Sequence, residues 1–440
     1  MKLIKLKSLD LFIAILSAIA VNFFSYAPFL YLSDWLVDHK QNIFISLVAI
    51  SIMFCLFRAM RSQVNRFEPL VVSFLYIPFA IYALLNFMII GNLLNDSFTI
   101  RTLALVNPVF VLLALFCSHT KRDLIRVTTA LSSIYLLFLI SGIAGGYITV
   151  SSTVSQNIFV GMEGSFYQNI NSYLGLFAIS CTYFYGINKR YLNFALSGFI
   201  LFSLSGMLWI GGRSSFVAVI AIFAIYFWDK IVHDASRKRM IVTIAIAIVL
   251  FMFMAVAFRS DTVDLLEGSI TLRRLTLLTE GGDPSERIYL FGKALELFWS
   301  DSGTILFGAG INSYPIYINA FSTGMYPHNV LLELLAEYGI TGLVLFVAPI
   351  VYIIRCRQKE LGSIYGKTVE ERTAFLFFVY YCLTYSFTGG LRHSWFLLFY
   401  SFLLYPTKSL HRRVVPIRRA PRWLEALDER QLREELTVRR

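Results

Sequence analysis

The chain has 440 residues, of which 57% are hydrophobic and only 15% are charged, and its mean hydropathy is +0.66. A soluble protein would carry about 25% charged residues. The composition therefore excludes an ordinary soluble protein and predicts an integral membrane protein surrounded by lipid. The formal net charge is +12, and its basic residues gather between apolar runs, so we expect membrane lipids as partners and no nucleic acid.

Apolar runs that approach the thickness of a bilayer predict about twelve membrane-spanning helices. They lie near residues 11–33, 43–57, 70–91, 102–117, 124–145, 166–187, 191–210, 214–228, 240–258, 334–354, 372–388 and 394–406. The first run is too long for the core of a signal peptide, so we expect a retained helix. The predicted fold class is an all-α polytopic membrane protein.

Basic residues alternate between the connections, as the positive-inside rule requires. The inner set comprises the N-terminus and connections 58–69, 118–123, 188–190, 229–239 and 355–371. The short connections on the other side carry only Lys40, Arg101, Arg213 and Arg392. This pattern predicts that both termini are cytoplasmic and that connections 146–165 and 259–327 face the periplasm or cell exterior.

The predicted organisation is a transmembrane catalytic domain over residues 1–406, in which 259–327 form one large external loop, followed by a tail. The tail, 407–440, is rich in Arg, and its apolar residues fit one stripe of an amphipathic helix. We interpret it as a basic cytoplasmic helix on anionic lipid. The alternative is an appended, non-native segment, and no chemistry is assigned to it.

Arg213 lies in GGRSSF, between two apolar runs. The glycines allow a tight turn, and Ser214 or Ser215 can cap the helix that follows. An arginine that snorkels at a helix end is the plain interpretation. Its place on the side that positive charges avoid favours a function.

Arg287 lies in GGDPSERIYLFGKALELFW, where Asp283, Pro284 and Glu286 indicate a helix start. The arginine is then in the first turn of a helix whose apolar residues predict packing on the membrane face. A surface ion pair with Asp283 or Glu286 is the alternative interpretation, and it would contribute under about 1 kcal/mol.

His328 follows Pro327 in MYPHNVLLELLAEYGITG and opens the next predicted helix. The positive end of that helix dipole disfavours the imidazolium, so the ring should stay neutral and able to accept a proton. A packed or capping histidine is the alternative. Glu333 and Glu337 share one face of the helix; we expect structural roles first, with Glu337 at a helix end before Gly339, although membrane carboxylates often serve function.

Arg392 and His393, in TGGLRHSW, form a further external pair, which can be a turn anchored at the interface or part of a site. The topology places Arg213, Arg287, His328 and Arg392 on one outer face. Arginines beside a neutral histidine are typical of a site that binds a polyanion and activates a hydroxyl. Asp261 and Asp264 are the nearest candidate metal ligands, and we expect no metal and no cofactor.

The run PHNVLLELLAEYGITGLVLF resembles the HN-x-x-LE-x-x-x-E-x-G-x-x-G signature of the bacterial O-antigen ligase and O-antigen polymerase family. GGRSSF, SERIYLFGKALELF and ILFGAGINSYP match upstream elements in order, although the family's usual proline before FG-x-G is absent. The resemblance spans roughly residues 160–400. It implies a GT-C-like glycosyltransferase of the bacterial inner membrane with a periplasmic active site.

The resemblance also implies a role for each matched residue. Arg213 and Arg287 would bind the diphosphate of an undecaprenyl-linked glycan, and His328 would deprotonate the acceptor hydroxyl for an inverting attack. Four further residues would contact the acceptor or support the residues that bind the donor: Arg392, His393, Glu333 and Glu337.

The resemblance is compatible with two reactions, polymerisation and ligation, which differ in the acceptor. A polymerase, which the forms HNVLLELLAEYGITG and SFTGGLRHSWF favour, extends one lipid-linked glycan with another, and a chain-length regulator is then a possible partner. A ligase would instead use lipid A-core as acceptor. A polysaccharide or lipid transporter is the alternative outside enzymes, but the sequence lacks the internal repeat common in that class.

Overall fold

The computed structural model describes part of the chain. The described residues are 46, 76–90, 121–122, 125–126, 128–130, 132–133, 136–137, 149–150, 159–160, 166–185, 190–210, 213–233, 284–311, 313–319, 326–366, 368–387 and 395–406. All the elements named below belong to the compact unit Met1–Leu404, and the predicted tail 407–440 lies outside the described residues.

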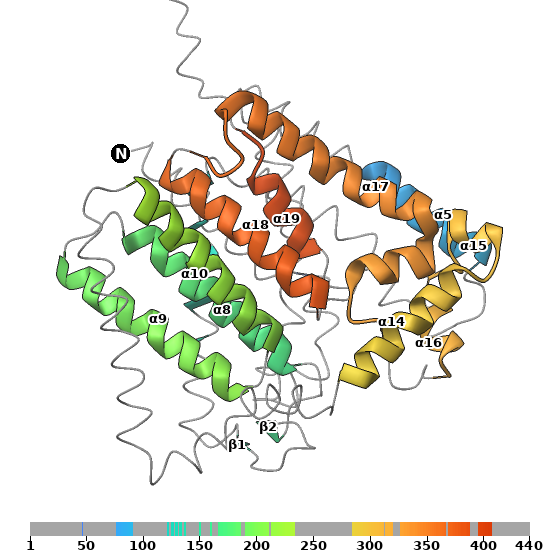
Figure 1. Ribbon diagram of the computed structural model, residues 1–440, viewed down its shortest axis with the longest axis horizontal. Coiled ribbons are helices and arrows are strands. Elements are labelled where there is room, and N and C mark those ends of the chain that lie inside the picture. The colour runs from blue at the N-terminus through green and yellow to red at the C-terminus, as the bar shows by residue number, and fades with distance from the viewer. Residues whose placement is uncertain are drawn as a thin grey trace, which may run out of the picture. The chain divides into compact units, whose positions relative to one another are not determined.

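The described chain is almost wholly helical (Figure 1). Its helices are α5 (Ile77–Ile90), α8 (Phe166–Tyr185), α9 (Arg190–Ile210), α10 (Arg213–His233), α14 (Pro284–Phe298), α15 (Ser302–Phe307), α16 (Ser313–Tyr317), α17 (Val330–Leu361), α18 (Val369–Phe387) and α19 (Trp395–Leu403). Strands β1 (Thr149–Val150) and β2 (Phe159–Val160) pair antiparallel, with Thr149 opposite Val160.

The predicted helical class is confirmed in this part of the chain, since helices occupy the predicted spans near 70–91, 166–187, 191–210, 214–228, 334–354, 372–388 and 394–406. Among the described residues, α17 is the helix long and apolar enough to cross a bilayer. The short strand pair departs from a purely α fold. The twelve spans, the sidedness of the termini and a GT-C-like arrangement stay predictions.

Helices α8, α9 and α10 pack together, and α8 and α10 also contact α18, which in turn contacts α19 (Figure 1). Helices α8 and α18 approach closely at Gly175, where an added Cβ would overlap the Tyr380 side chain. The Tyr380 hydroxyl donates to the carbonyl of Ser172 at 3.1 Å. Small residues and interhelical hydrogen bonds of this kind are what join helices in lipid.

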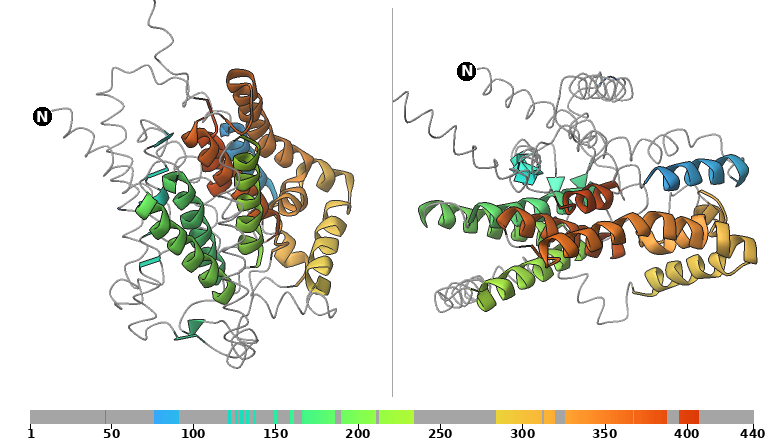
Figure 2. Two further views of the ribbon diagram at one scale, coloured as in Figure 1. Left: turned by 60° about the vertical axis from the view of Figure 1, so that its left-hand side comes forward. Right: turned by 90° about the horizontal axis from the view of Figure 1, so that it is seen from above.

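Helices α14, α15 and α16 pack on α17, and α5 lies on the side of α17 opposite α14 (Figure 2, right). Leu290, Ala294 and Leu297 of α14 share one apolar cluster with Tyr314 and Ala336. The Tyr314 hydroxyl also donates to the carbonyl of Leu290 at 2.9 Å. This packing brings the first turns of α14 and α17 into one region.

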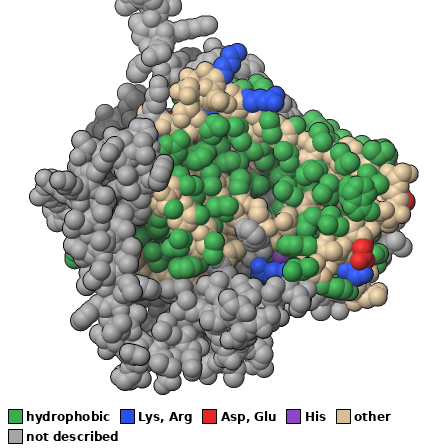
Figure 3. All heavy atoms as spheres, in the orientation of Figure 1, with side chains coloured by type: hydrophobic (Ala, Val, Ile, Leu, Met, Phe, Trp, Pro, Cys, Tyr) green, Lys and Arg blue, Asp and Glu red, His purple; other side chains and the backbone are tan. Residues whose placement is uncertain are grey.

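Hydrophobic side chains cover most of the face formed over α17, α18 and α14 (Figure 3). Large apolar residues of α17 and of the segment around α14 are exposed, among them Ile288, Trp299, Ile340 and Val344. In a soluble protein such an extended apolar surface would be unusual. It fits helices that face lipid.

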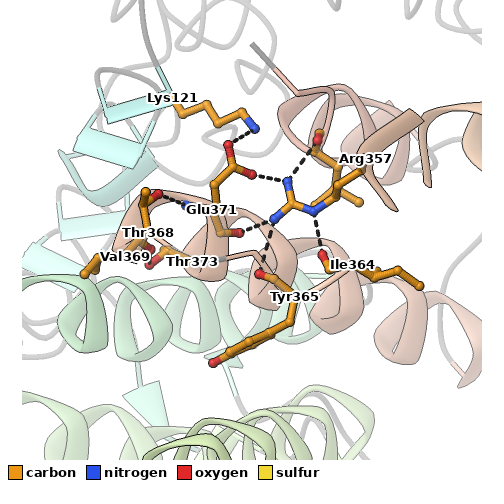
Figure 4. A network of polar contacts seen from close by, with 9 residues as sticks. Lys121, Arg357, Ile364, Tyr365, Thr368, Val369, Glu371 and Thr373 are labelled. Carbon is orange, nitrogen blue, oxygen red and sulfur yellow. Dashed lines mark hydrogen bonds and ion pairs between the residues drawn. The ribbon is translucent and has the colours of Figure 1, made fainter. Parts of the chain in front are cut away.

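The C-terminal end of α17 carries a buried ion cluster (Figure 4). Arg357 is fully buried and pairs with the carboxylate of Glu371 at the start of α18, and Lys121 contacts the other oxygen of that carboxylate at 2.5 Å. The sequence placed Arg357 in a cytoplasmic connection, 355–371. In the structure α17 continues as a helix to Leu361, past the end of the apolar run, so Arg357 lies in the last turns of the helix.

Candidate active site

His328 lies just before α17, between the buried Pro327 and Asn329. Its φ is 56°, in the left-handed region that side chains with a Cβ rarely adopt. Such a conformation costs about 1–3 kcal/mol and persists only where surrounding contacts fix it. The sequence predicted that His328 opens the helix, whereas it stands one residue before the capping residue.

Asn329 is the N-cap of α17. Its side-chain oxygen accepts hydrogen bonds from the amides of Leu331 and Leu332, at 2.9 and 3.1 Å. Its side-chain nitrogen donates to the carbonyl of Ser386, near the end of α18, at 3.0 Å. Asn329 therefore fixes the segment that carries His328 to a second helix. Sequence reasoning missed this role, although an asparagine before an apolar helix is a capping signal.

The His328 ring packs against Tyr326, with ring centroids 4.2 Å apart. Its Nδ1 is buried and has no hydrogen-bond partner among the residues described. Burial, and then the positive charge of Arg287, lower the pKa of His328 to about 4. The ring is therefore neutral near pH 7. The sequence predicted this direction from the helix dipole, but burial is the larger cause.

Arg287 lies in the first turn of α14, which begins at Pro284 as predicted. Its side chain is half-buried, and its charge acts on the His328 ring. The contact between α14 and α17 thus brings together two of the candidate residues, which are 41 positions apart in the sequence.

Glu333 and Glu337 lie one turn apart on α17, and both side chains are buried, with 7% and 4% of their surface exposed. The sequence left open whether Glu337 marks a helix end before Gly339. The regular helix is interrupted at Gly339, at φ 65° and ψ −169°, and a second helical segment of α17 follows, so the expected end is present as a break. The two carboxylates therefore belong to the N-terminal segment of a broken helix.

Arg213 begins α10, as the GGRSSF turn predicted. Ser214 and Ser215, in the first turn, are buried, and the Ser215 hydroxyl lies 3.5 Å from that of Ser172 on α8. The side chain of Arg213 is outside the described part of the structure. Arg392 and His393 fall between α18 and α19, also outside the described residues.

The described residues contain no group of three or more His, Cys, Asp or Glu side chains that could hold a metal ion. The candidate pair Asp261 and Asp264 lies outside these residues. The described site has a neutral imidazole, which suits proton transfer, and a guanidinium, which suits anion binding.

The fold and site define a helical protein with apolar outward faces and a half-buried imidazole, whose Nδ1 is buried, beside an arginine at one end of its longest described helix. Residues 192–347 match the family model described as O-antigen ligase. The match covers roughly a third of the chain and includes Arg213, Arg287 and His328. No curated protein matches the chain.

The match supports the assignment that the sequence motifs predicted, to the O-antigen ligase and polymerase family. This family consists of bacterial inner-membrane proteins of lipopolysaccharide and polysaccharide assembly, with activity of the membrane-glycosyltransferase type. Lipid-linked glycans and lipid A-core are the general substrates of such a family.

Proposed function

We propose that the chain transfers a glycan from an undecaprenyl-diphosphate carrier to a hydroxyl of an acceptor glycan at the periplasmic face, as an O-antigen or exopolysaccharide polymerase. The observation that carries the proposal is His328. It is a neutral imidazole with a buried, unpartnered Nδ1 among the described residues, beside the charge of Arg287. A general base and an anion-binding group are the two parts that this transfer needs.

In the proposed step, His328 accepts the proton of the acceptor hydroxyl while the oxygen attacks the anomeric carbon of the donor. The bond between that carbon and the diphosphate oxygen breaks, and the diphosphate leaves with the electron pair. Attack from the face opposite the leaving group inverts the configuration. Arg287 and Arg213 bind the diphosphate and stabilise its growing charge, so the step requires no metal.

Donor binding also adjusts the base. A histidine whose pKa is about 4 is a weak base at neutral pH. A diphosphate bound to Arg287 brings negative charge next to the ring and offsets the arginine charge that lowers the pKa. The proton affinity of His328 therefore rises when donor is present, which favours proton transfer in the substrate complex over the free protein.

The ligase reaction is a second candidate, favoured by the description of the matched family model as O-antigen ligase. It uses the same donor and the same chemistry, but the acceptor is lipid A-core. A deletion strain separates the two reactions. Loss of a polymerase leaves a single repeat unit on the lipid core, and loss of a ligase leaves long chains on the polyprenyl carrier.

The enzyme proposal is tested by glycan chain length in cells that carry His328→Ala or Arg287→Ala. We expect both variants to lose long chains at a normal protein level. Lys293→Ala is the matched control, because it removes a positive charge from the same helix where the ammonium contacts Glu296 at the surface, 2.5 Å away. Unchanged chains in both site variants would overturn the catalytic proposal and favour a transporter.

A further inference from the structure

The break in α17 leaves backbone groups without helical partners. Gly339 departs from helical dihedrals, so the carbonyls of Ala336, Glu337 and Tyr338 face a discontinuity in the helix. Unpaired carbonyls in an apolar interior are costly, so each needs another donor. The donors come from outside the helix.

The turn that follows α15 supplies two of these donors. The amide of Ala309 donates to the carbonyl of Ala336 at 2.9 Å, and the amide of Gly310 donates to that of Glu337 at 3.0 Å. The approach is close enough that a Cβ on Gly308 would overlap the backbone of Glu337. A Cβ on Gly339 would lie 2.6 Å from the carbonyl oxygen of Leu306. The FG-x-G motif is thus a backbone cap on the broken helix.

Helix α5 packs on α17 next to α15 (Figure 1) and completes this junction. The Tyr82 hydroxyl lies 3.0 Å from the carbonyl oxygen of Tyr338 and 2.7 Å from that of Phe307, so it shares its proton between the helix break and the turn. The side-chain amide of Asn86 donates to the same Phe307 carbonyl at 2.8 Å. Two side chains one turn apart on α5 therefore join the turn to α17.

The junction separates the outer segment of α17, residues 330–338, from the rest of the helix. That outer segment carries Glu333 and Glu337, and His328 precedes it directly. A helix break has no backbone ladder to fix the angle between its two halves, so external hydrogen bonds must set it. The orientation of His328 toward Arg287 depends on that angle.

We propose that Tyr82 and Asn86 are positioning residues, which hold the outer segment of α17 in its reactive orientation through the FG-x-G turn. The inference rests on the proposed catalytic role of His328. Both residues lie more than 100 positions before the segment 192–347 that the family model matches, so the motif alone does not include them.

The geometric part is tested by the distance between two spin labels on α17 in the full chain. Leu331 and Val351 are exposed on either side of the break, 45% and 39% respectively, and a continuous helix would separate them by about 30 Å. We expect Tyr82→Phe combined with Asn86→Leu to shift or broaden the distance distribution. Tyr76→Phe is the matched control, because it removes a buried hydroxyl near the start of α5 that bonds Ser401 instead, at 3.1 Å.

The functional part is tested by the rate of glycan transfer in isolated membranes that contain lipid-linked repeat units. Because small misplacements of reacting groups are costly, we expect the double variant to lower kcat roughly tenfold and leave KM nearly unchanged. Tyr76→Phe should keep both constants.

Each outcome decides a different statement. The positioning proposal is overturned if the label distances stay as in the parent chain, or if Tyr76→Phe changes them equally. It is also overturned if the distances change and transfer does not, while His328→Ala is inactive. If the distances change and His328→Ala remains active, the role of Tyr82 and Asn86 in the helix geometry stands and the proposed catalysis fails.

Discussion

The two ends of α17 both bury polar groups, but they treat them differently. At the C-terminal end, Arg357 donates from Nε to the carbonyl of Ile364 at 2.5 Å and from Nη1 to that of Leu404 at 2.9 Å. Its Nη2 donates to the carbonyl of Glu371 at 2.7 Å, and its Nη1 contacts the Glu371 carboxylate. At the N-terminal end, His328 has a left-handed backbone and an Nδ1 that bonds nothing among the residues described.

The difference separates structure from function. A buried charge whose donors are all paired holds segments together, and removing one partner is expensive. A buried polar atom without a partner, in a strained backbone, costs stability and calls for another explanation. The cluster at the C-terminal end ties α17, α18 and the end of α19 to Lys121, whereas the N-terminal end holds the group that we propose acts on a substrate.

The largest expected effect is the loss of transfer activity when His328, at the N-terminal end of α17, is replaced. His328→Gly should lower the transfer rate by about 10²–10⁴-fold, as expected for loss of a general base. Because glycine adopts a positive φ without strain, the same change should raise the free energy of unfolding by about 1 kcal/mol. Thermal unfolding in detergent and a transfer assay measure the two effects. A stability loss at this position would break the contrast between the two ends.

Arg357→Ala should have the opposite profile. It removes one of the two cations that contact the Glu371 carboxylate and leaves Lys121 as the other, which should lower the free energy of unfolding by about 3 kcal/mol. Arg355→Ala is the control, because Arg355 is exposed two residues earlier on the same helix. Thermal unfolding gives the difference, and transfer per folded molecule should be unchanged. Equal melting temperatures for the two variants would mean that the cluster of Arg357, Glu371 and Lys121 does not stabilise the fold.

The close contact at the helix break gives a third test. Gly308 has φ 82°, and a Cβ there would overlap the backbone of Glu337. Gly308→Ala should therefore lower the free energy of unfolding by about 2–4 kcal/mol and reduce activity. Gly292→Ala, on α14 where an added Cβ meets nothing within 4 Å, should be neutral or slightly stabilising. Similar losses for both glycines would contradict the proposed fit of the turn.

The pKa of His328 predicts a pH dependence of stability. The folded pKa is about 4, below the usual value of about 6.5, so the folded state binds this proton less readily than the unfolded chain. The contribution is complete above pH 6.5 and is lost as the pH falls toward 4, by up to about 3 kcal/mol. Between pH 7 and pH 4, the free energy of unfolding should decrease less steeply for His328→Gly than for the parent chain. Parallel curves would show that His328 is not buried as neutral imidazole.

The smallest expected effect is at the cap. Asn329→Ala removes the acceptor for two α17 amides and should lower the free energy of unfolding by about 1 kcal/mol. Asn329→Asp keeps the acceptor but loses the donor to Ser386, so it isolates the tether to α18 from the cap. We expect Asn329→Asp to retain stability and lose transfer rate. If Asn329→Asp transfers normally, the tether does not position His328.

Local patterns in the sequence determined much of this protein. Apolar runs predicted the helices, glycine and serine predicted the start of α10 at Arg213, and Pro284 predicted the start of α14. The HN motif and its upstream elements predicted the family that the match over residues 192–347 supports. These features depend on neighbours within a few turns, which is the range that periodicity and capping signals cover.

Tertiary structure alone decided the rest. Gly339 looks like a helix end in the sequence, but capping by a turn some 30 residues earlier lets α17 resume beyond it. Arg357 looks like a loop charge and is buried against Glu371. Tyr82 reaches a carbonyl 256 residues away. Hydropathy and local spacing contain no information on such contacts, because burial and hydrogen bonding between distant segments arise only when the helices pack.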